Sequence, residues 1–414
     1  MMDRRAALAA LGSAACAAAR SVPPPATPPC PTRALRSGLP VTTAEAAGLR
    51  AEGVAALVER SRASGSHALV VLHDGAVAVE EYFGGRPRPI CAMSASKSVA
   101  QLAVAALVRG VHAHLDEPMT RAFPAWRADR RKSKILLRHL LSHGSGLDVR
   151  RADFDAGETI ERAAERAPMR HEPGMDFRYN NLAVDCLAPF VRARSGLHLD
   201  DLLQREVFGP LGVRGAWWVK DAAGCPRAAG ELMIEPLELA KVGQLMLQDG
   251  VWEGRRVLPH GWVAQSTAPS QPYHQGCGLL WWLHGPRAWS LGEELFASWE
   301  EAGVAQDVIA RVRPLAGRRF TSEAALARAR DARLTPDQRR ELRRALDVRR
   351  AEPARVALTG APTAYYAKGW VGQWLVVVPS RRVVAVRMRA VDRHDQRDSR
   401  AHEHRGFVDD ALAL

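Results

Sequence analysis

A serine and a lysine three residues apart, Ser94 and Lys97, are the side chains of this sequence best suited to covalent chemistry. They lie at the start of an apolar stretch that we expect to form a buried helix over 96–109. Residues three apart share one face of a helix, so the hydroxyl and the amine would converge. This pairing indicates an activated serine nucleophile. The alternative is a serine that caps the helix, followed by a surface lysine.

The composition draws attention to Lys97 independently. The chain contains 58 lysines and arginines together, and only six of them are lysines. A sequence that otherwise uses arginine for positive charge therefore has an amine at this position. Unlike a guanidinium, an amine can lose its proton near neutral pH when it is desolvated.

Length and charge narrow the class of protein. With 414 residues and 47% hydrophobic content, the chain can form two domains, or one large domain with a subdomain. The formal charge of +13 makes nucleic acid or an anionic membrane a candidate partner. However, the arginines are spread along the chain, and no stretch alternates basic with aromatic residues. We therefore expect no specific nucleic-acid partner and interpret the charge as a solvated, arginine-rich surface.

The cysteines and histidines do not predict a metal centre. Four cysteines in the body of the chain lack Cys-x-x-Cys spacing, and either disulfides or buried thiols would suit an exported protein. His139 and His143 are four residues apart, but no acidic residue lies between them as in a metalloprotease helix. We expect structural histidines, no metal and no other cofactor. The four cysteines are Cys91, Cys186, Cys225 and Cys277.

The first 40 residues indicate export. Residues 1–20 join a basic start to a small-residue apolar run that is too short to span a bilayer. We expect an export signal to the periplasm or the exterior, and Arg4-Arg5 points to the twin-arginine route. Ser13-Ala14-Ala15-Cys16 is a poor lipobox, so an N-terminal lipid tether is a weaker alternative. A second alternative is that these residues are the frayed N-terminus of a cytoplasmic protein. Residues 21–40 form a proline-rich linker, and no later stretch is apolar enough to cross a membrane.

Hydrophobic periodicity predicts a mixed α/β protein with two antiparallel hairpins. The first hairpin turns at Asp74-Gly75, a type I′ signal, and the second spans 374–388. We expect a sheet-containing domain from residues 41–108 and 270–414, and a mainly helical domain over 109–269. The expected strands are 67–73, 76–83, 276–283, 374–378 and 383–388, and helices are expected at 43–61, 96–109 and 407–412.

Residues 292–352 form an unusual block of short, charged helices. The expected helices are 293–302, 304–312 and 322–331, with a fourth announced by Thr335-Pro336-Asp337-Gln338, which has the residues of a capping box. The block is either a lid or partner-docking insertion, or a helical subdomain without a function of its own.

Three motifs follow one another along the chain: Ser94-Ala95-Ser96-Lys97, Tyr179-Asn180-Asn181 and Gly369-Trp370-Val371-Gly372-Gln373. In this order they resemble the motifs of the serine β-lactamase and penicillin-binding-protein superfamily. The resemblance is strongest to its esterases and 6-aminohexanoate-oligomer hydrolases, which are related to class C β-lactamases. It implies an α/β (α+β) fold in which helices flank an antiparallel sheet beside an all-helical domain. It runs from about residue 41 to the C-terminus, except for 292–352, and is supported by 140–147, 173–174, 249–252 and 278–282.

The resemblance implies a serine hydrolase that forms an acyl-enzyme with a small ester or amide. Ser94 would attack the carbonyl carbon, and Lys97 with Tyr179 would transfer protons, although which of the two is the acylation base stays open. Asn181 would orient Lys97 or a substrate amide. The backbone N–H groups of Ser94 and Gln373 would form the oxyanion hole.

The third motif departs from the superfamily pattern. β-Lactamases and cell-wall peptidases have lysine or histidine where this chain has Trp370, which lies before Gly372 in the predicted oxyanion and substrate-binding segment. Tryptophan offers an apolar face and one N–H but no positive charge for a substrate carboxylate, so an ester or uncharged amide is favoured. Trp281 and Trp282 are expected to add aromatic wall. The alternatives are a β-lactamase or D-Ala-D-Ala carboxypeptidase, and a non-catalytic binding protein that uses the helical insertion.

Overall fold

A computed structural model describes residues 38–148, 157–349, 354–390, 403–404 and 406–414. The predicted export signal and residues 21–37 of the predicted linker lie outside these ranges. Within the ranges that are described, no helix combines the length and apolar character needed to cross a membrane.

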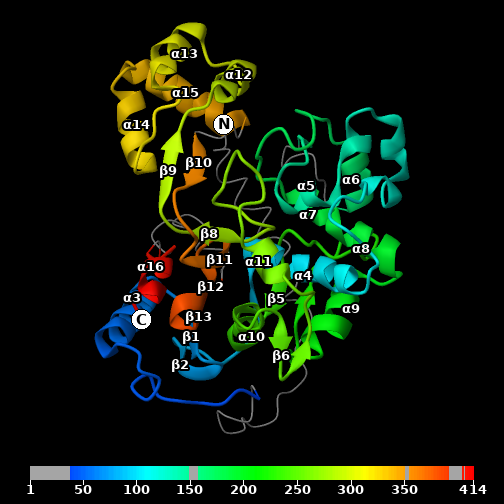
Figure 1. Cartoon of the computed structure of the whole chain (residues 1–414), viewed down its shortest axis with the longest axis vertical. Helices are drawn as coiled ribbons and strands as arrows, with labels where there is room; N and C mark the ends of the chain where they lie inside the picture. Colours follow the sequence, from blue (N-terminus) through cyan, green and yellow to red (C-terminus); the bar gives the residue numbers. More distant parts are fainter. Residues whose placement is uncertain (1–37, 149–156, 350–353, 391–402, 405) are drawn as a thin grey trace.

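A six-stranded antiparallel sheet forms the centre of the molecule (Figure 1). The strand order is β2-β1-β13-β12-β11-β8, so the N-terminal hairpin joins the C-terminal strands through the pairing of β1 with β13. Both predicted hairpins are present, and φ is positive at Asp74 (52°) and Gly75 (81°), as a type I′ turn requires. The strands are β1 (Ala68–His73), β2 (Ala76–Tyr82), β8 (Trp282–His284), β11 (Ala364–Gly369), β12 (Gln373–Val378) and β13 (Val383–Met388).

Helices cover both faces of this sheet. On one face, α3 (Ala51–Ala63) and α16 (Phe407–Leu412) contribute to one apolar cluster with alternate residues of β1, β12 and β13. On the other face lies α10 (Pro236–Leu247), where a Cβ at Gly243 would come within 2.5 Å of a Val384 methyl group. The glycine therefore allows the helix to approach the sheet closely. Thus α10 packs on the sheet, although its residues fall in the stretch that we assigned to the helical domain.

The predicted nucleophile helix, α4 (Ser96–Arg109), lies between the sheet and the helical region. Twelve of its residues are buried, as expected for a mostly apolar helix. A small sheet, β3-β5-β4, also crosses this region. The remaining elements are α5 (Leu137–Leu141), α6 (Ile160–Arg166), α7 (Asn181–Asp185), α8 (Leu187–Ser195), α9 (Leu199–Leu203), α11 (Trp262–Ser266), β3 (Ile90–Cys91), β4 (Trp217–Trp218), β5 (Leu232–Ile234), β6 (Val251–Trp252) and β7 (Arg255–Arg256).

The helical insertion has its own apolar core and stands at one end of the molecule, on a two-stranded ribbon (Figure 1). All four predicted helices are present. The capping box is also confirmed, because the Gln338 N–H donates to Thr335 Oγ1 (3.3 Å) and the Thr335 N–H donates to Gln338 Oε1 (3.0 Å). The elements are β9 (Arg287–Ser290), α12 (Glu293–Glu301), α13 (Gln306–Val312), α14 (Glu323–Asp331), α15 (Pro336–Arg349) and β10 (Arg355–Leu358).

Two sequence predictions need correction. The strand expected over 276–283 is limited to β8, because the chain before it is irregular and Leu280 has a positive φ of 60°. The helix expected to begin near residue 43 begins at Ala51, after a turn in which Gly48 has φ 70°. The sequence left open whether the four cysteines form disulfides, and the structure shows them as buried free thiols.

Candidate active site

Ser94 lies on a single 3₁₀ turn, η2 (Met93–Ala95), that leads directly from β3 into α4. Within residues 90–107, Ser94 is the one partly exposed residue. Met93 before it has φ 50°, an unfavourable conformation for a non-glycine residue. Ser96 holds this turn, because its Oγ donates to the Met93 carbonyl (2.6 Å) and accepts from the Leu232 N–H (3.1 Å). The hydroxyl of Ser94 is therefore presented from a fixed, strained turn.

Lys97 is buried beside this hydroxyl, with 3% of its surface exposed. Its Nζ is 3.1 Å from Ser94 Oγ and donates to the Ala229 carbonyl oxygen at 2.5 Å. It also lies 4.8 Å from the centroid of the Tyr179 ring. The structure thus brings together Ser94, Lys97 and Tyr179, and a solvated surface lysine is excluded.

Tyr179 precedes α7 and lies in an aromatic cluster. Its ring is 4.6 Å from that of His143 and nearly parallel to that of Trp282, at 6.2 Å and 13°. Its hydroxyl makes no hydrogen bond to any residue that the structure describes. Phe177 and His274 extend the cluster, with ring centroids 4.6 Å apart. Ring packing on both neighbours therefore fixes the plane of the phenol.

His143 packs against the Tyr179 ring as a neutral imidazole. It is buried, with φ 57°, and desolvation together with the charge of Lys97 lowers its pKa to about 3. The Asn180 N–H points at Nδ1 (3.4 Å), which places the ring proton on Nε2. His139 instead accepts the Leu136 N–H at the start of α5. In the described part of the chain, no three metal-binding side chains converge.

Acidification is expected to destabilise the fold through His143. The unfolded side chain takes up a proton below its ordinary pKa of 6.5, whereas the buried ring does so only near 3, so stability is lost as pH falls through this window. Between pH 7 and pH 5, wild type should lose about 2 kcal/mol more unfolding free energy than His143→Gln. Urea denaturation at both pH values measures this, with His114→Gln, at an exposed position, as control. Equal losses in wild type and His143→Gln would contradict the prediction.

Asp185 was not predicted from the sequence, and it supports Lys97 indirectly. The side chain is buried at the end of α7, and its Oδ1 accepts the Ala229 N–H at 2.7 Å. The same residue, Ala229, offers its carbonyl to Lys97. Desolvation raises the pKa of Asp185 to about 7, partly offset by the Ala229 N–H and by Lys97. The available sequence signal was an isolated acid in the apolar run 182–188.

The third motif forms the tight turn between β11 and β12. Gly369, at the end of β11, faces the Ser94 turn, and a Cβ there would clash with the Ala92 carbonyl oxygen. Glycine therefore lets the two segments approach. Trp370 is half-buried in the turn, whereas Gln373 is fully buried, with its side chain hydrogen-bonded in both directions to the backbone of Arg389.

Two expected contacts are not made. Asn181 is exposed as the first residue of α7 and makes no hydrogen bond to Lys97, so its other expected role, orienting a substrate amide, stays a prediction. Its neighbour Asn180 is buried and caps α7, with Oδ1 accepting the Ala183 N–H (3.1 Å). Of the tryptophan pair, Trp282 reaches Tyr179, but Trp281 is fully buried in the core. Alternation of side chains at the start of β8 separates the two.

The sheet, the helical region and the Ser94–Lys97–Tyr179 arrangement define a protein of the β-lactamase and transpeptidase class. The chain belongs to the Beta-lactamase family, whose model matches residues 54–406.

Two relatives carry enzymatic names. Esterase EstB of Burkholderia gladioli is 30% identical over 208 residues, which cover 44% of this chain and 50% of the esterase. The 6-aminohexanoate-dimer hydrolase of Paenarthrobacter ureafaciens is 32% identical over 120 residues, which cover 28% of this chain and 30% of that hydrolase. The matched segments thus span half of the esterase and 30% of the 6-aminohexanoate-dimer hydrolase.

Solved structures support the fold. EstCE1, described as a hydrolase with promiscuous acyltransferase activity, has a TM-score of 0.56 at 15% identity, with 87% of this chain and 98% of that chain covered. The octameric penicillin-binding protein homologue from Pyrococcus abyssi has a TM-score of 0.54 at 15% identity, with coverage of 88% and 76%. At these identities the likeness shows the fold alone.

Proposed function

We propose that this protein is a serine hydrolase that acts through an acyl-enzyme on a small ester or amide. One observation carries the proposal: a buried lysine amine lies 3.1 Å from the hydroxyl of a partly exposed serine. A serine hydroxyl is a weak nucleophile until a neighbouring base takes its proton. The names of the two relatives, an esterase and a 6-aminohexanoate-dimer hydrolase, support the same reaction class.

In the proposed acylation step, Ser94 Oγ forms a bond to the substrate carbonyl carbon while its proton passes to Lys97 or Tyr179. The oxyanion of the tetrahedral intermediate accepts hydrogen bonds from the backbone N–H groups of Ser94 and Gln373. Each bond would stabilise the transition state by about 3 to 4 kcal/mol. The bond to the leaving group then breaks, and that group takes the proton. Water then attacks the acyl carbon and gives its proton to the same base. The bond to Ser94 Oγ breaks, and Ser94 takes that proton back.

The residue type at position 370 favours an uncharged substrate. Trp370 stands where a cation would bind a carboxylate. The nearest lysine in sequence, Lys368, lies on the other face of the sheet, where its Nζ is 5.0 Å from the Trp374 ring centroid and 3.9 Å from Glu403. This follows from the alternation of side chains along β11. We therefore place esters and neutral amides before β-lactams, which carry a carboxylate.

A substrate panel tests this preference. We expect kcat/KM for short-chain p-nitrophenyl esters to exceed that for nitrocefin by at least about 100-fold, a difference that a missing charge-assisted hydrogen bond helps to produce. Trp370→Lys should raise nitrocefin turnover about 10-fold. Trp370→Phe, which keeps an aromatic ring, is the control and should not raise it. Rapid nitrocefin hydrolysis by wild type would instead favour a β-lactamase.

A further inference from the structure

Arg387 lies buried behind the turn that carries the third motif. It belongs to β13, pairs in register with Trp374 of β12 and has no exposed surface. Its Nη1 donates to the carbonyl oxygens of Val371 (3.2 Å) and Gly372 (2.5 Å). One guanidinium nitrogen therefore holds two successive carbonyl groups of the turn.

The backbone of this turn needs such support. Val371 has φ 58°, which is rare for a β-branched residue, and Gly372 follows with φ 79°. Unfavourable conformations of this kind persist where the surroundings hold them in place. A Cβ at Gly372 would clash with Arg387 Nη1 and would lie 2.5 Å from the Glu403 carbonyl oxygen. The glycine is thus required by the close approach of the arginine.

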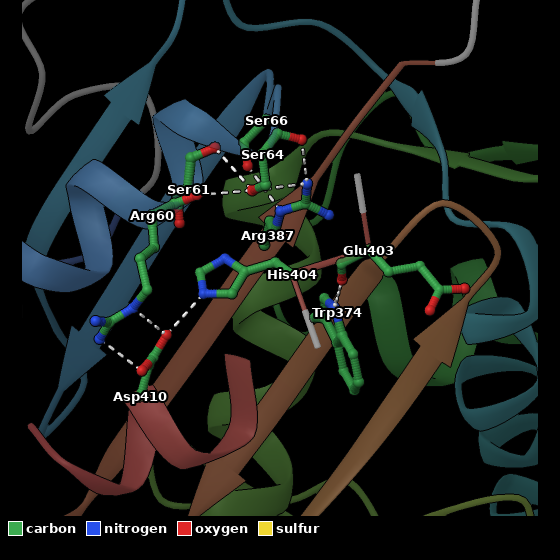
Figure 2. A network of polar contacts seen from close by, with 9 residues as sticks. All are labelled: Arg60, Ser61, Ser64, Ser66, Trp374, Arg387, Glu403, His404 and Asp410. Carbon is green, nitrogen blue, oxygen red and sulfur yellow. Dashed lines mark hydrogen bonds and ion pairs between the residues drawn. The ribbon is translucent and has the colours of Figure 1, made fainter. Parts of the chain in front are cut away.

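The other side of the guanidinium is fixed to the loop between α3 and β1 (Figure 2). Arg387 Nε donates to Ser66 Oγ at 2.7 Å, and Nη2 donates to the Ser64 carbonyl oxygen at 3.0 Å and to Ser64 Oγ at 3.2 Å. Because Arg387 is held at both ends, it links the turn to a separate part of the sheet domain.

A second segment, Glu403-His404, also lies against Gly372 of the turn. The Glu403 carbonyl oxygen accepts the Trp374 Nε1–H at 3.0 Å. His404 Nε2 is 2.7 Å from Asp410, which also pairs with Arg60 of α3 (Figure 2). Arg387 therefore holds the turn itself, and the Glu403-His404 segment holds Trp374 of the adjoining strand β12.

We propose that Arg387 is a positioning residue for acyl transfer. It holds Val371 and Gly372 so that the next N–H, that of Gln373, and the Trp370 side chain face the acyl group on Ser94. This inference rests on the proposed function. Oxyanion donors act by being fixed before charge develops, and displacement by about 1 Å costs about 100-fold in rate. Loss of the guanidinium would let the left-handed residues relax, and Gln373 would move with them.

Two variants of Arg387 test the proposal. Arg387→Lys keeps the charge but loses the planar fork, and Arg387→Met loses both. We expect kcat for a p-nitrophenyl ester to fall about 100-fold in each, with KM changed less than about threefold. Labelling by a fluorophosphonate should slow by a similar factor. The matched control is Arg109→Met, because Arg109 also donates to a backbone carbonyl, that of Val257 (2.8 Å), and lies at the far end of α4.

Ser66→Ala gives a milder variant in case those of Arg387 do not fold. It removes one acceptor of the guanidinium and should lower kcat about three- to tenfold at unchanged KM. Wild-type kcat in Ser66→Ala, and in each Arg387 variant that folds, would overturn the inference. So would an equal loss of kcat in Arg109→Met. Failure of the proposed function looks different, because wild type itself would then neither react with the fluorophosphonate nor turn over esters.

Discussion

Replacement of Ser94 by alanine is expected to lower kcat/KM for p-nitrophenyl esters by about 10⁴-fold or more. In the proposed reaction the Ser94 oxygen bonds to the substrate, and the structure places it 3.1 Å from the Lys97 amine, one of the two candidate acylation bases. Because Ser94 is partly exposed, the loss of one hydroxyl should leave the unfolding midpoint in urea almost unchanged. Turnover and denaturation of the same preparation separate the two effects.

The control for this substitution is Ser133→Ala. Ser133 is a partly exposed serine whose hydroxyl bonds only to the Arg130 carbonyl oxygen (3.3 Å) among the described residues. It should keep full activity. Ester turnover by Ser94→Ala within tenfold of wild type would place the nucleophile elsewhere.

Replacement of Lys97 by arginine is expected to lower kcat about 10²- to 10⁴-fold while the positive charge is kept. A guanidinium does not give up its proton in proteins, so the variant separates proton transfer from charge. In wild type, the buried Lys97 Nζ contacts both Ser94 Oγ and the Ala229 carbonyl oxygen. Lys97→Met, which keeps the stem and removes the charge, should be impaired at least as strongly.

Lys134→Arg is the control for Lys97→Arg. Lys134 is a half-exposed lysine that pairs with Glu172 at 2.9 Å, and its replacement should leave kcat unchanged. Activity of Lys97→Arg close to that of wild type would show that position 97 contributes only a charge. In that case Tyr179 would be the remaining candidate for the acylation base.

Much of the fold follows from local sequence patterns. The Asp74-Gly75 hairpin, the helix over 96–109 and the strand over 383–388 occur where turn chemistry and periodicity predict them. The family motifs then gave the fold as a whole. These elements are predictable because their residues are either buried on every side or bounded by a strong turn signal.

The candidate site was only partly predictable. Spacing along a helix placed Lys97 beside Ser94, but no local pattern could show that Asp185 fixes Ala229 or that Arg387 supports the third motif. Both contacts join segments far apart in the chain and depend on tertiary packing. The expectation that both Trp281 and Trp282 line the site was wrong for Trp281, because neighbouring residues on a strand point to opposite faces.

The site of covalent modification by a fluorophosphonate probe tests the central claim most directly. The probe is added to wild type and to Ser94→Ala, the intact masses are compared, and the modified peptide is sequenced by mass spectrometry. We predict one adduct per wild-type chain, located on Ser94, and none on the variant. Equal labelling of the variant, or an adduct on another residue of wild type, would contradict the claim that Ser94 is the nucleophile.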